Sequence, residues 1–224
     1  MKKLFLLTLC VLMFLMPVFA SAEVNAGDII TFGAYEQDGD TSNGKEAIEW
    51  LVLDYDAENN RALVISKYVL DAKAYNDEWA KVTWETCTLR AWLNEEFMNA
   101  AFNTEEQQMI PTVTVNVDKN PDFNITPGNA TRDKVFLLSI TEADRYFTDN
   151  DTRMCVPTKY AAVNLVVWGN GCCGWWLRTP GCFNDYAADV SNSGLIDNAG
   201  FIVYDSSLVS GIRPAMWIDL SLTN

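Results

Sequence analysis

Residues 171–181, with the sequence GCCGWWLRTPG, constrain the fold of this 224-residue chain more than any other stretch. Trp175 and Trp176 are adjacent, with Gly174 before them and Pro180 closely after them. Each aromatic side chain buries roughly 150–250 Å², so two neighbouring tryptophans need a packed core. A short apolar run between turn residues predicts a buried strand, and we expect the core to form around it.

Arg178 continues this run, and Arg213 lies in a second run of β character. A charged side chain inside a core strand needs carboxylate or carbonyl partners. A guanidinium can reach such partners through planar, two-point hydrogen bonds that tie loops together. We therefore expect Arg178 and Arg213, like Trp175 and Trp176, to be structural residues.

The N-terminal part of the fold is expected to be β structure. Residues 27–36 alternate between apolar and polar side chains, as a half-buried strand does. Residues 48–55 and 62–67 flank a turn at Asn59 and Asn60, and this pattern predicts a β-hairpin.

The next part of the chain changes to a helical pattern. Apolar side chains recur at helical spacing between residues 84 and 110, at Leu89, Trp92, Leu93, Phe97 and Ala101. A second short helix is expected to begin with Thr104 as its N-cap and to end before Pro111. Both helices are expected to pack on the core.

The remainder predicts a loop, two helices and a β-rich C-terminal third. Residues 112–134 are rich in Asn, Asp and Pro and are expected to be mostly loop. A strand is expected at 135–139, followed by helices at 141–147 and 158–167. Turn residues then separate four predicted strands, at 175–179, 187–191, 200–205 and 212–220. No linker divides residues 23–224, so we expect a single domain there.

Residues 1–22 are typical of a secretory signal peptide. Two lysines precede an apolar run over residues 4–19, and Ala20-Ser21-Ala22 fits the small-x-small cleavage rule. An uncleaved membrane anchor is the alternative, because the run approaches the ~20 residues of a span. We expect an exported protein, secreted or at the cell surface, with no stable membrane span after cleavage.

The charge of the chain limits its partners. It carries 16 basic and 30 acidic residues, which gives a formal net charge of −14. Nucleic acids and anionic membranes attract basic patches, so neither is an expected partner. The chain also contains no histidine, which excludes Ser-His-Asp and Cys-His catalysis and the commonest zinc ligand.

Five cysteines follow the predicted signal peptide: Cys87, Cys155, Cys172, Cys173 and Cys182. In an exported protein they are candidates for disulfides, and the odd number leaves at least one thiol free or bonded between chains. We expect Cys155 to bond Cys172 or Cys173, and we favour Cys173 because it lies nearer the buried strand. No C-x-x-C pair is present, so neither a metal site nor a cofactor is expected.

The acidic residues of segment 38–49 match part of the ligand spacing of a calcium-binding EF-hand loop. Carboxylates stand at positions 1, 3 and 12 of an EF-hand pattern, with Ser42 at position 5. Asn43 replaces the glycine that the sharp turn requires, and a strand follows instead of a helix. A plain surface loop is therefore favoured over a calcium site.

Four blocks in order carry a resemblance to a known family: WETCxLRxWLN at 84–94, VFLLS at 135–139, WWLRTPG at 175–181 and GIRPAMW at 211–217. They resemble a family of secreted bacterial proteins of unknown function. That family is similar to the C-type-lectin-like fold of formylglycine-generating enzymes and of the variable proteins of diversity-generating retroelements. The resemblance implies an α+β fold, with a twisted antiparallel sheet, helices packed on it, and exposed variable positions on the C-terminal strands.

An enzymatic function is not expected. Formylglycine-generating enzymes need two reactive thiols across a groove, whereas Cys172 and Cys173 are adjacent and no histidine can activate them. Paired carboxylates for glycoside hydrolysis stay open as an alternative, but no spacing singles out one pair. The sugar-site signatures of calcium-dependent lectins are absent from the sequence.

The last strands and the loop before them predict a binding surface. Alternation places Ala188, Val190, Phe201 and Val203 in the core. The residues expected to point outward and bind a ligand are Phe183, Asn184, Asp185, Tyr186, Asp189, Ser191, Ile202, Tyr204 and Asp205. The expected partner is a protein or glycan outside the cell. A cell-envelope structural role without a defined ligand is the alternative.

Overall fold

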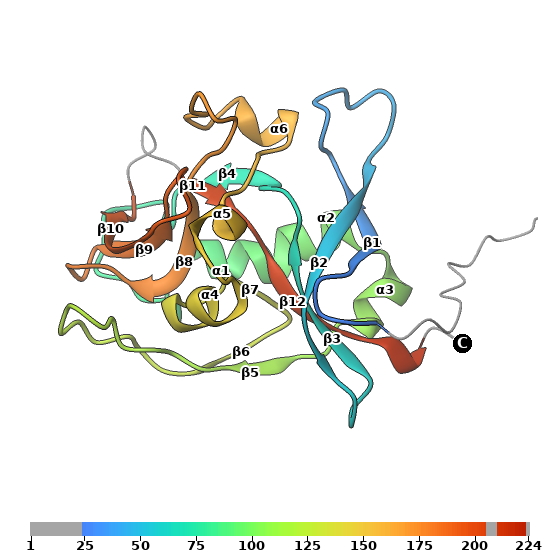
Figure 1. Cartoon of the computed structure of the whole chain (residues 1–224), viewed down its shortest axis with the longest axis horizontal. Coiled ribbons are helices and arrows are strands. Elements are labelled where there is room, and N and C mark those ends of the chain that lie inside the picture. Colours follow the sequence, from blue (N-terminus) through green and yellow to red (C-terminus); the bar gives the residue numbers. More distant parts are fainter. Residues whose placement is uncertain (1–23, 205–209, 223–224) are drawn as a thin grey trace, which may run out of the picture.

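The computed structural model describes residues 24–204 and 210–222, as a mixed fold of several antiparallel sheets and short helices (Figure 1). The C-terminal part is rich in strands, as the sequence predicts. The predicted signal peptide at residues 1–22 and the predicted site residue Asp205 lie outside the described residues. Within the described ranges, no helix has the length and apolar character needed to cross a membrane.

The first sheet contains the predicted hairpin and has five strands. Its neighbouring strands are antiparallel, in the order β1 (Ile29–Tyr35), β2 (Glu46–Asp56), β3 (Arg61–Ser66), β12 (Ala215–Asp219) and β7 (Val135–Phe136). Asn60 in the β2–β3 turn adopts a φ of 49°, a conformation that Asn tolerates better than most residues. The hairpin therefore forms where the two asparagines are found.

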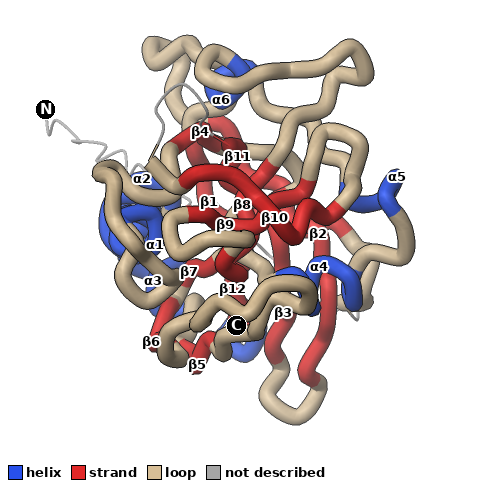
Figure 2. Tube along the Cα trace, turned by 90° about the vertical axis from the view of Figure 1, so that its left-hand side faces the viewer, coloured by secondary structure: helices blue, strands red, loops and turns tan. Residues whose placement is uncertain are grey.

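The second sheet is formed mainly by the C-terminal third and lies beside the first (Figures 1 and 2). Its order is β10 (Ile196–Ile202), β9 (Tyr186–Val190), β8 (Trp175–Pro180), β11 (Ser210–Ile212) and β4 (Asp71–Lys73). Strands β8 and β11 are parallel, and the other neighbours are antiparallel. Strand β9 is thus an interior strand with β10 and β8 on its two sides.

The single strand predicted at 212–220 is wrong. The chain forms β11 in the second sheet, leaves it at Arg213 and Pro214, and enters the first sheet as β12. Proline has no backbone N–H to donate to a strand ladder, so Pro214 favours a break at this point. This crossing links the two sheets.

Helices are short and cover the sheets. The first helix predicted between residues 84 and 110 appears as α1 (Thr88–Trp92), a π-helical turn η1 (Leu93–Phe97) and α2 (Met98–Ala101). The next helix, α3 (Thr104–Met109), is capped by Asn103, which accepts hydrogen bonds from the amides of Glu105 and Glu106. The prediction of Thr104 as the N-cap is therefore wrong by one residue.

The remaining elements are α4 (Ile140–Tyr146), α5 (Asn150–Arg153), α6 (Lys159–Ala162), the 3-10 turn η2 (Leu220–Leu222), and a two-stranded sheet of β5 (Val113–Val115) and β6 (Thr131–Asp133). The helix predicted at 158–167 is shorter than expected: it spans Lys159–Ala162, with Thr158 as its N-cap. Residues 163–168 after it are not helical, and they expose several apolar side chains.

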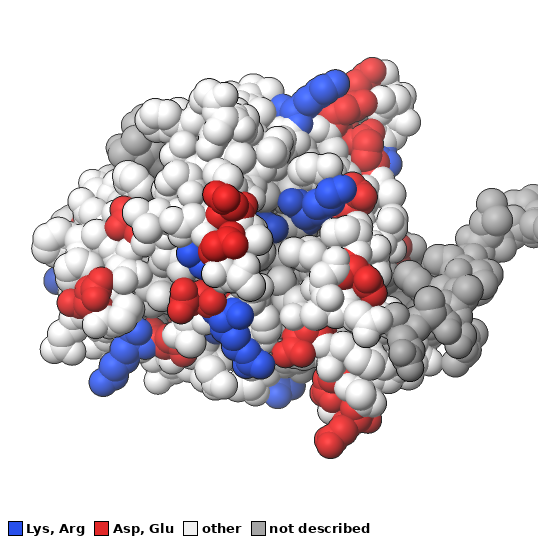
Figure 3. Space-filling model, in the orientation of Figure 1, with Lys and Arg blue, Asp and Glu red and all other residues white. Residues whose placement is uncertain are grey.

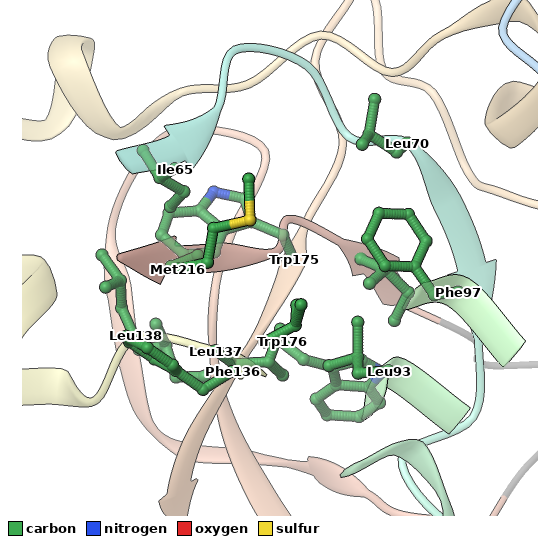
Figure 4. Close-up of a cluster of buried hydrophobic side chains, with 14 of the residues drawn as sticks. Ile65, Leu70, Leu93, Phe97, Phe136, Leu137, Leu138, Trp175, Trp176 and Met216 are labelled. Carbon is green, nitrogen blue, oxygen red and sulfur yellow. The ribbon is translucent and has the colours of Figure 1, made fainter. Parts of the chain in front are cut away.

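The core lies between the sheets and the α1–α2 segment (Figure 4). Trp175 and Trp176 of β8 are fully buried and belong to one cluster with Met216 of β12, Phe97 of η1 and Leu138. The Trp176 indole packs edge-on against Tyr75, with ring centroids 5.6 Å apart. Both indole N–H groups also donate to backbone carbonyls, so no polar atom of this pair is left unsatisfied.

The predicted alternation of the last strands holds in part. Ala188, Val190 and Val203 are buried, as expected. Phe201, which was expected in the core, is 44% exposed. The pairing of β10 with β9 shifts register between Asp197 and Phe201, and such a bulge turns the following side chains to other directions.

Candidate functional site

Four aromatic side chains and one carboxylate form a group on the molecular surface, which we call the aromatic surface. Its members are Trp79, Phe183, Asp185, Tyr186 and Tyr204. The rings of Trp79 and Tyr204 meet edge-on with centroids 6.5 Å apart, and those of Phe183 and Tyr186 meet at 5.3 Å. The Trp79 indole Nε1 donates to Asp185 Oδ2 at 3.1 Å.

Backbone hydrogen bonds hold these segments in place. The amide of Val203 donates to the carbonyl of Asp185 at 2.9 Å, and the amide of Val82 donates to the carbonyl of Asn184 at 3.1 Å. Tyr186 of β9 is paired with Ile202 of β10. The loop before β9, the end of β10 and the segment around Trp79 are therefore joined by main-chain contacts.

The aromatic surface is open to solvent. Trp79 is 70% exposed and Phe183 is 60% exposed, while Asp185, Tyr186 and Tyr204 are half-buried. Large apolar side chains so exposed mark binding sites when they are grouped. Of the other predicted residues, Asn184 is exposed here, and Ile202, the strand partner of Tyr186, is half-buried.

Trp79 is a site residue that no sequence pattern predicted. It lies in the polar segment Asn76-Asp77-Glu78-Trp79, where neither helical nor strand periodicity predicts an apolar side chain. The signal in the sequence that could have indicated a binding residue is a single tryptophan in a polar loop, outside any apolar periodicity. Its contact with Asp185 joins residues 106 positions apart, which no local pattern encodes.

Asp189 is not on this surface, and its predicted outward orientation is wrong. The side chain is 2% exposed, and the successive residues 187–190 of β9 are all buried, so side chains on both faces of this strand are covered. Asp189 lines a separate pocket of about 490 Å³ together with Ser191, which is half-buried. The predicted site residues therefore divide between two places.

The floor of this pocket, which we call the Asp189 pocket, is formed by the second sheet. Gly174 at the start of β8 lies so close that a Cβ there would meet Asp189 Oδ2 at 3.3 Å and the Ser210 hydroxyl at 3.6 Å. Its wall is apolar and comes from the segment after α6 and from β10. The wall residues are Val163, Leu165, Val166, Trp168 and Phe201.

The Asp189 carboxyl has an unusual electrostatic environment. Its Oδ1 is buried and has no hydrogen-bond partner among the described residues. Burial, reinforced by the nearby carboxylate of Asp197, raises the pKa of Asp189 to about 8. Asp197 is the cross-strand partner of Asp189 on β10, so the two acidic groups lie on neighbouring strands.

The two core arginines differ in how they are satisfied. Arg178 is buried and bonds the Glu142 carboxylate, while it also donates to the carbonyls of Leu137 and Asn116 at 2.7 and 3.1 Å. Arg213 lies against the rings of Phe147 and Trp175, 5.0 and 5.1 Å from their centroids. Both lie inside the fold and away from the aromatic surface.

Arg213 is less completely paired. Its Nε donates to the Ser66 carbonyl at 2.9 Å, whereas Nη1 has no hydrogen-bond partner among the described residues. Burial lowers the pKa of its guanidinium. The flanking aromatic faces supply part of the missing stabilisation through cation–π contacts.

Cys155 and Cys173 are partners in an isolated antiparallel bridge, in which the Cys173 amide donates to the Cys155 carbonyl at 3.1 Å. The structure holds both side chains as free thiols, together with Cys87, Cys172 and Cys182. Burial raises the pKa of the Cys155 thiol, and it raises that of Cys173 to about 12. The bond between the two residues stays a prediction.

The region considered for calcium contains a different acidic group. Oxygens of Glu36, Asp38 and Glu46 lie within 4.8 Å of one another. Each of these side chains accepts hydrogen bonds from backbone amides of the same loop, such as that from the Gln37 amide to Glu46 at 2.7 Å. These carboxylates stabilise the loop by accepting its amide hydrogen bonds. Their positions in the sequence do not follow the EF-hand spacing.

Surface charge is mixed on the face shown in Figure 3, where basic side chains lie among acidic ones. With a net charge of −14, the protein offers little attraction to a polyanion.

The family comparison matches well over half of the chain. The model of a domain of unknown function, DUF6273, covers residues 59–220, which include both the aromatic surface and the Asp189 pocket. Neither a curated protein nor a solved structure matches the chain. The chain therefore belongs to the DUF6273 family of domains of unknown function.

Proposed function

We propose that this protein is an exported binding protein, and that its aromatic surface holds a protein or glycan ligand outside the cell. The observation that carries the proposal is the grouping of Trp79, Phe183, Tyr186 and Tyr204 from separate parts of the chain. Aromatic side chains supply large, rigid contact area at low entropic cost, and they dominate the energetics of binding surfaces.

Asp185 gives this surface a polar group for orientation. Its carboxylate already holds the Trp79 indole in place at 3.1 Å, and Asn184 offers an exposed amide beside it. A surface that is ordered before binding loses less conformational entropy when a ligand binds. The main-chain bonds of Val203 and Val82 supply this order.

The resemblance to C-type-lectin-like proteins supports this place for the site, because loops and strands near the C-terminus contact the ligand in those proteins. The proposal includes no catalytic role. The buried thiols of Cys155 and Cys173 have raised pKa values, and a protonated thiol is a poor nucleophile.

The test is a binding screen with a matched pair of tryptophan variants. Wild-type protein, Trp79→Ala and Trp168→Ala are compared on arrays of glycans and of purified cell-surface proteins. Both tryptophans are exposed, but Trp168 belongs to the wall of the Asp189 pocket. We expect Trp79→Ala to lose about 30-fold or more in affinity for the captured ligand, as hot-spot aromatics do. Trp168→Ala should retain this binding.

A second variant, Phe183→Ala, should bind the same ligand more weakly, because the Phe183 ring lies against Tyr186 in the same group. Melting temperatures of all variants are measured in parallel, to separate binding from folding. A ligand that binds wild type, Trp79→Ala and Phe183→Ala equally well contradicts the proposed surface.

A further inference from the structure

The Asp189 pocket contains a buried carboxyl oxygen to which the described part of the fold donates no hydrogen bond. Asp189 Oδ1 has no partner among the described residues, although Asp189 lies in an interior strand among Ala187, Ala188 and Val190. An unsatisfied buried polar group costs stability, and protein interiors rarely retain one without a partner. An alanine or valine would fit the surroundings in the strand at no such cost.

The charges around the pocket are of one sign. From β10 the carboxylate of Asp197 acts on Asp189, and no lysine or arginine among the described residues acts on it. The other elements present Gly174, which directly precedes β8, Ser210 from β11, and uncharged side chains from residues 163–168. The site therefore has a negative potential when Asp189 is ionised, and the described residues place no cation against it.

The wall of the pocket is suited to an apolar body. Trp168 is 57% exposed, and the exposed side chains of Val163, Val166 and Phe201 line the same space. A volume of about 490 Å³ is within the range of pockets that hold small molecules. Aromatic rings beside a carboxylate are also the surroundings that bind ammonium groups, through cation–π contacts.

We propose that the Asp189 pocket binds a small organic cation, whose ammonium head pairs with the Asp189 carboxylate and whose apolar body lies against Trp168 and Phe201. The cation supplies the counter-charge that the ionised Asp189 carboxylate lacks among the described residues. This site is distinct from the aromatic surface, so it stands or fails independently of the proposed function.

Binding of a cation is coupled to loss of a proton. With its pKa raised to about 8, Asp189 is mostly protonated at neutral pH, and the ammonium head displaces the carboxyl proton into solvent. Affinity then scales with the ionised fraction, which rises about tenfold per pH unit below pH 8. A neutral ligand that accepted a hydrogen bond from the protonated carboxyl would show the opposite pH dependence.

The experiment is a calorimetric titration of the full chain with three named probes. Choline and 3,3-dimethylbutan-1-ol have nearly the same shape and differ in charge, and benzyltrimethylammonium adds an apolar body without a titrating group. We expect both cations to bind, the benzyl compound more tightly, and the neutral alcohol to bind at least tenfold more weakly than choline. The affinity of benzyltrimethylammonium should rise about tenfold between pH 6 and pH 7.

Three variants locate the site. Asp189→Asn keeps the shape of the side chain and should lose at least tenfold in affinity together with the pH dependence. Trp168→Ala should weaken benzyltrimethylammonium binding several-fold, whereas Trp79→Ala on the aromatic surface should leave it unchanged. Melting curves verify that each variant is folded.

Several results would overturn the proposal. These are no binding of either cation at millimolar concentration, equal binding of choline and its neutral counterpart, and unchanged affinity of Asp189→Asn. Affinity that falls as the pH rises would also overturn it, and would assign to the pocket a ligand that accepts a hydrogen bond from the protonated carboxyl.

Discussion

Arg178 and Glu142 form a two-point ion pair that joins strand β8 to helix α4. Glu142 Oε1 accepts from Nη2 at 2.9 Å, and Oε2 accepts from Nη1 of the same guanidinium. Glu142 also closes the capping box of α4, because its Oε2 accepts the Ser139 amide at 3.0 Å. One carboxylate thus satisfies a buried charge and a helix N-terminus together.

The change Glu142→Gln should lower the free energy of unfolding by about 2 kcal/mol. It keeps the shape and the capping group but leaves the buried Arg178 charge without its counter-ion. Chemical denaturation measures the difference. The control is Arg145→Gln, which removes an exposed ion pair with Asp54 at 3.5 Å and should cost about 0.5 kcal/mol or less. Equal costs for the two variants would argue against a structural role of the Arg178 pair.

Truncation of Val190 and Val203 to alanine should destabilise the fold by roughly 1–3 kcal/mol each. Both side chains are fully buried, so the change removes packed methyl groups and leaves a cavity. The matched control is Val163→Ala, because Val163 is an exposed valine and should change stability by about 0.5 kcal/mol at most. The three melting temperatures test the assignment of the strand faces.

The N-cap of α3 can be tested with neighbouring residues. Asn103→Ala removes the side chain that accepts from two amides and should cost about 1 kcal/mol. Thr104→Ala changes the first helical residue, which is exposed, and should alter stability by about 0.5 kcal/mol or less. A larger loss for Thr104→Ala would restore the cap predicted from the sequence.

Oxidised protein should contain a disulfide between Cys155 and Cys173, which the structure places as bridge partners. The bond closes a loop of about 18 residues and should contribute roughly 3 kcal/mol in the chain-entropy model. Non-reducing peptide mapping checks the pairing, with Cys87→Ser as a control that should leave it unchanged. Recovery of Cys155 as a free thiol after oxidation would refute it.

The stability of the fold should fall with rising pH through Asp189. Its pKa of about 8 in the folded state is above the ordinary value of about 4. The folded state therefore holds the proton more tightly, and this stabilisation is fully present below about pH 4 and is lost as the pH rises to about 8.

The measurement is the free energy of unfolding at several pH values for wild type and Asp189→Asn. Between pH 5 and pH 7, the free energy of unfolding of the wild type should fall by about 1 kcal/mol per pH unit relative to that of Asp189→Asn. At about pH 3, one unit below the ordinary pKa, the carboxyl is mostly protonated in both states, and the two proteins should be nearly alike. A difference that does not change with pH would place Asp189 in contact with water or with a partner.

Much of the local structure follows from patterns within a few residues. Asn59 and Asn60 predict the β2–β3 turn, Thr158 predicts the start of α6, and the two tryptophans at 175 and 176 predict β8. In each case the deciding chemistry acts at short range: a left-handed turn residue, a capping hydroxyl, and apolar surface that needs burial.

The candidate sites could be predicted only in part. The loop residues Phe183 and Tyr186 were found because exposed aromatics between turns are visible in the sequence. Trp79 was missed, since its contact with Asp185 bridges 106 positions. Asp189 was assigned to the wrong environment, since alternation predicts a half-exposed strand, whereas the side chains on both faces of β9 are buried.

The sequence by itself determined where the chain turns, which short segments become strands or helices, and which large side chains need a core. The tertiary structure alone decided that residues 212–220 divide between two sheets at Pro214 and that Phe201 turns toward solvent. It also decided that Asp189 Oδ1 lies buried with no hydrogen-bond partner among the residues that the structure describes. The physical reason is the range of the forces. Backbone propensities and caps depend on neighbours along the chain, whereas burial depends on which distant elements cover a face.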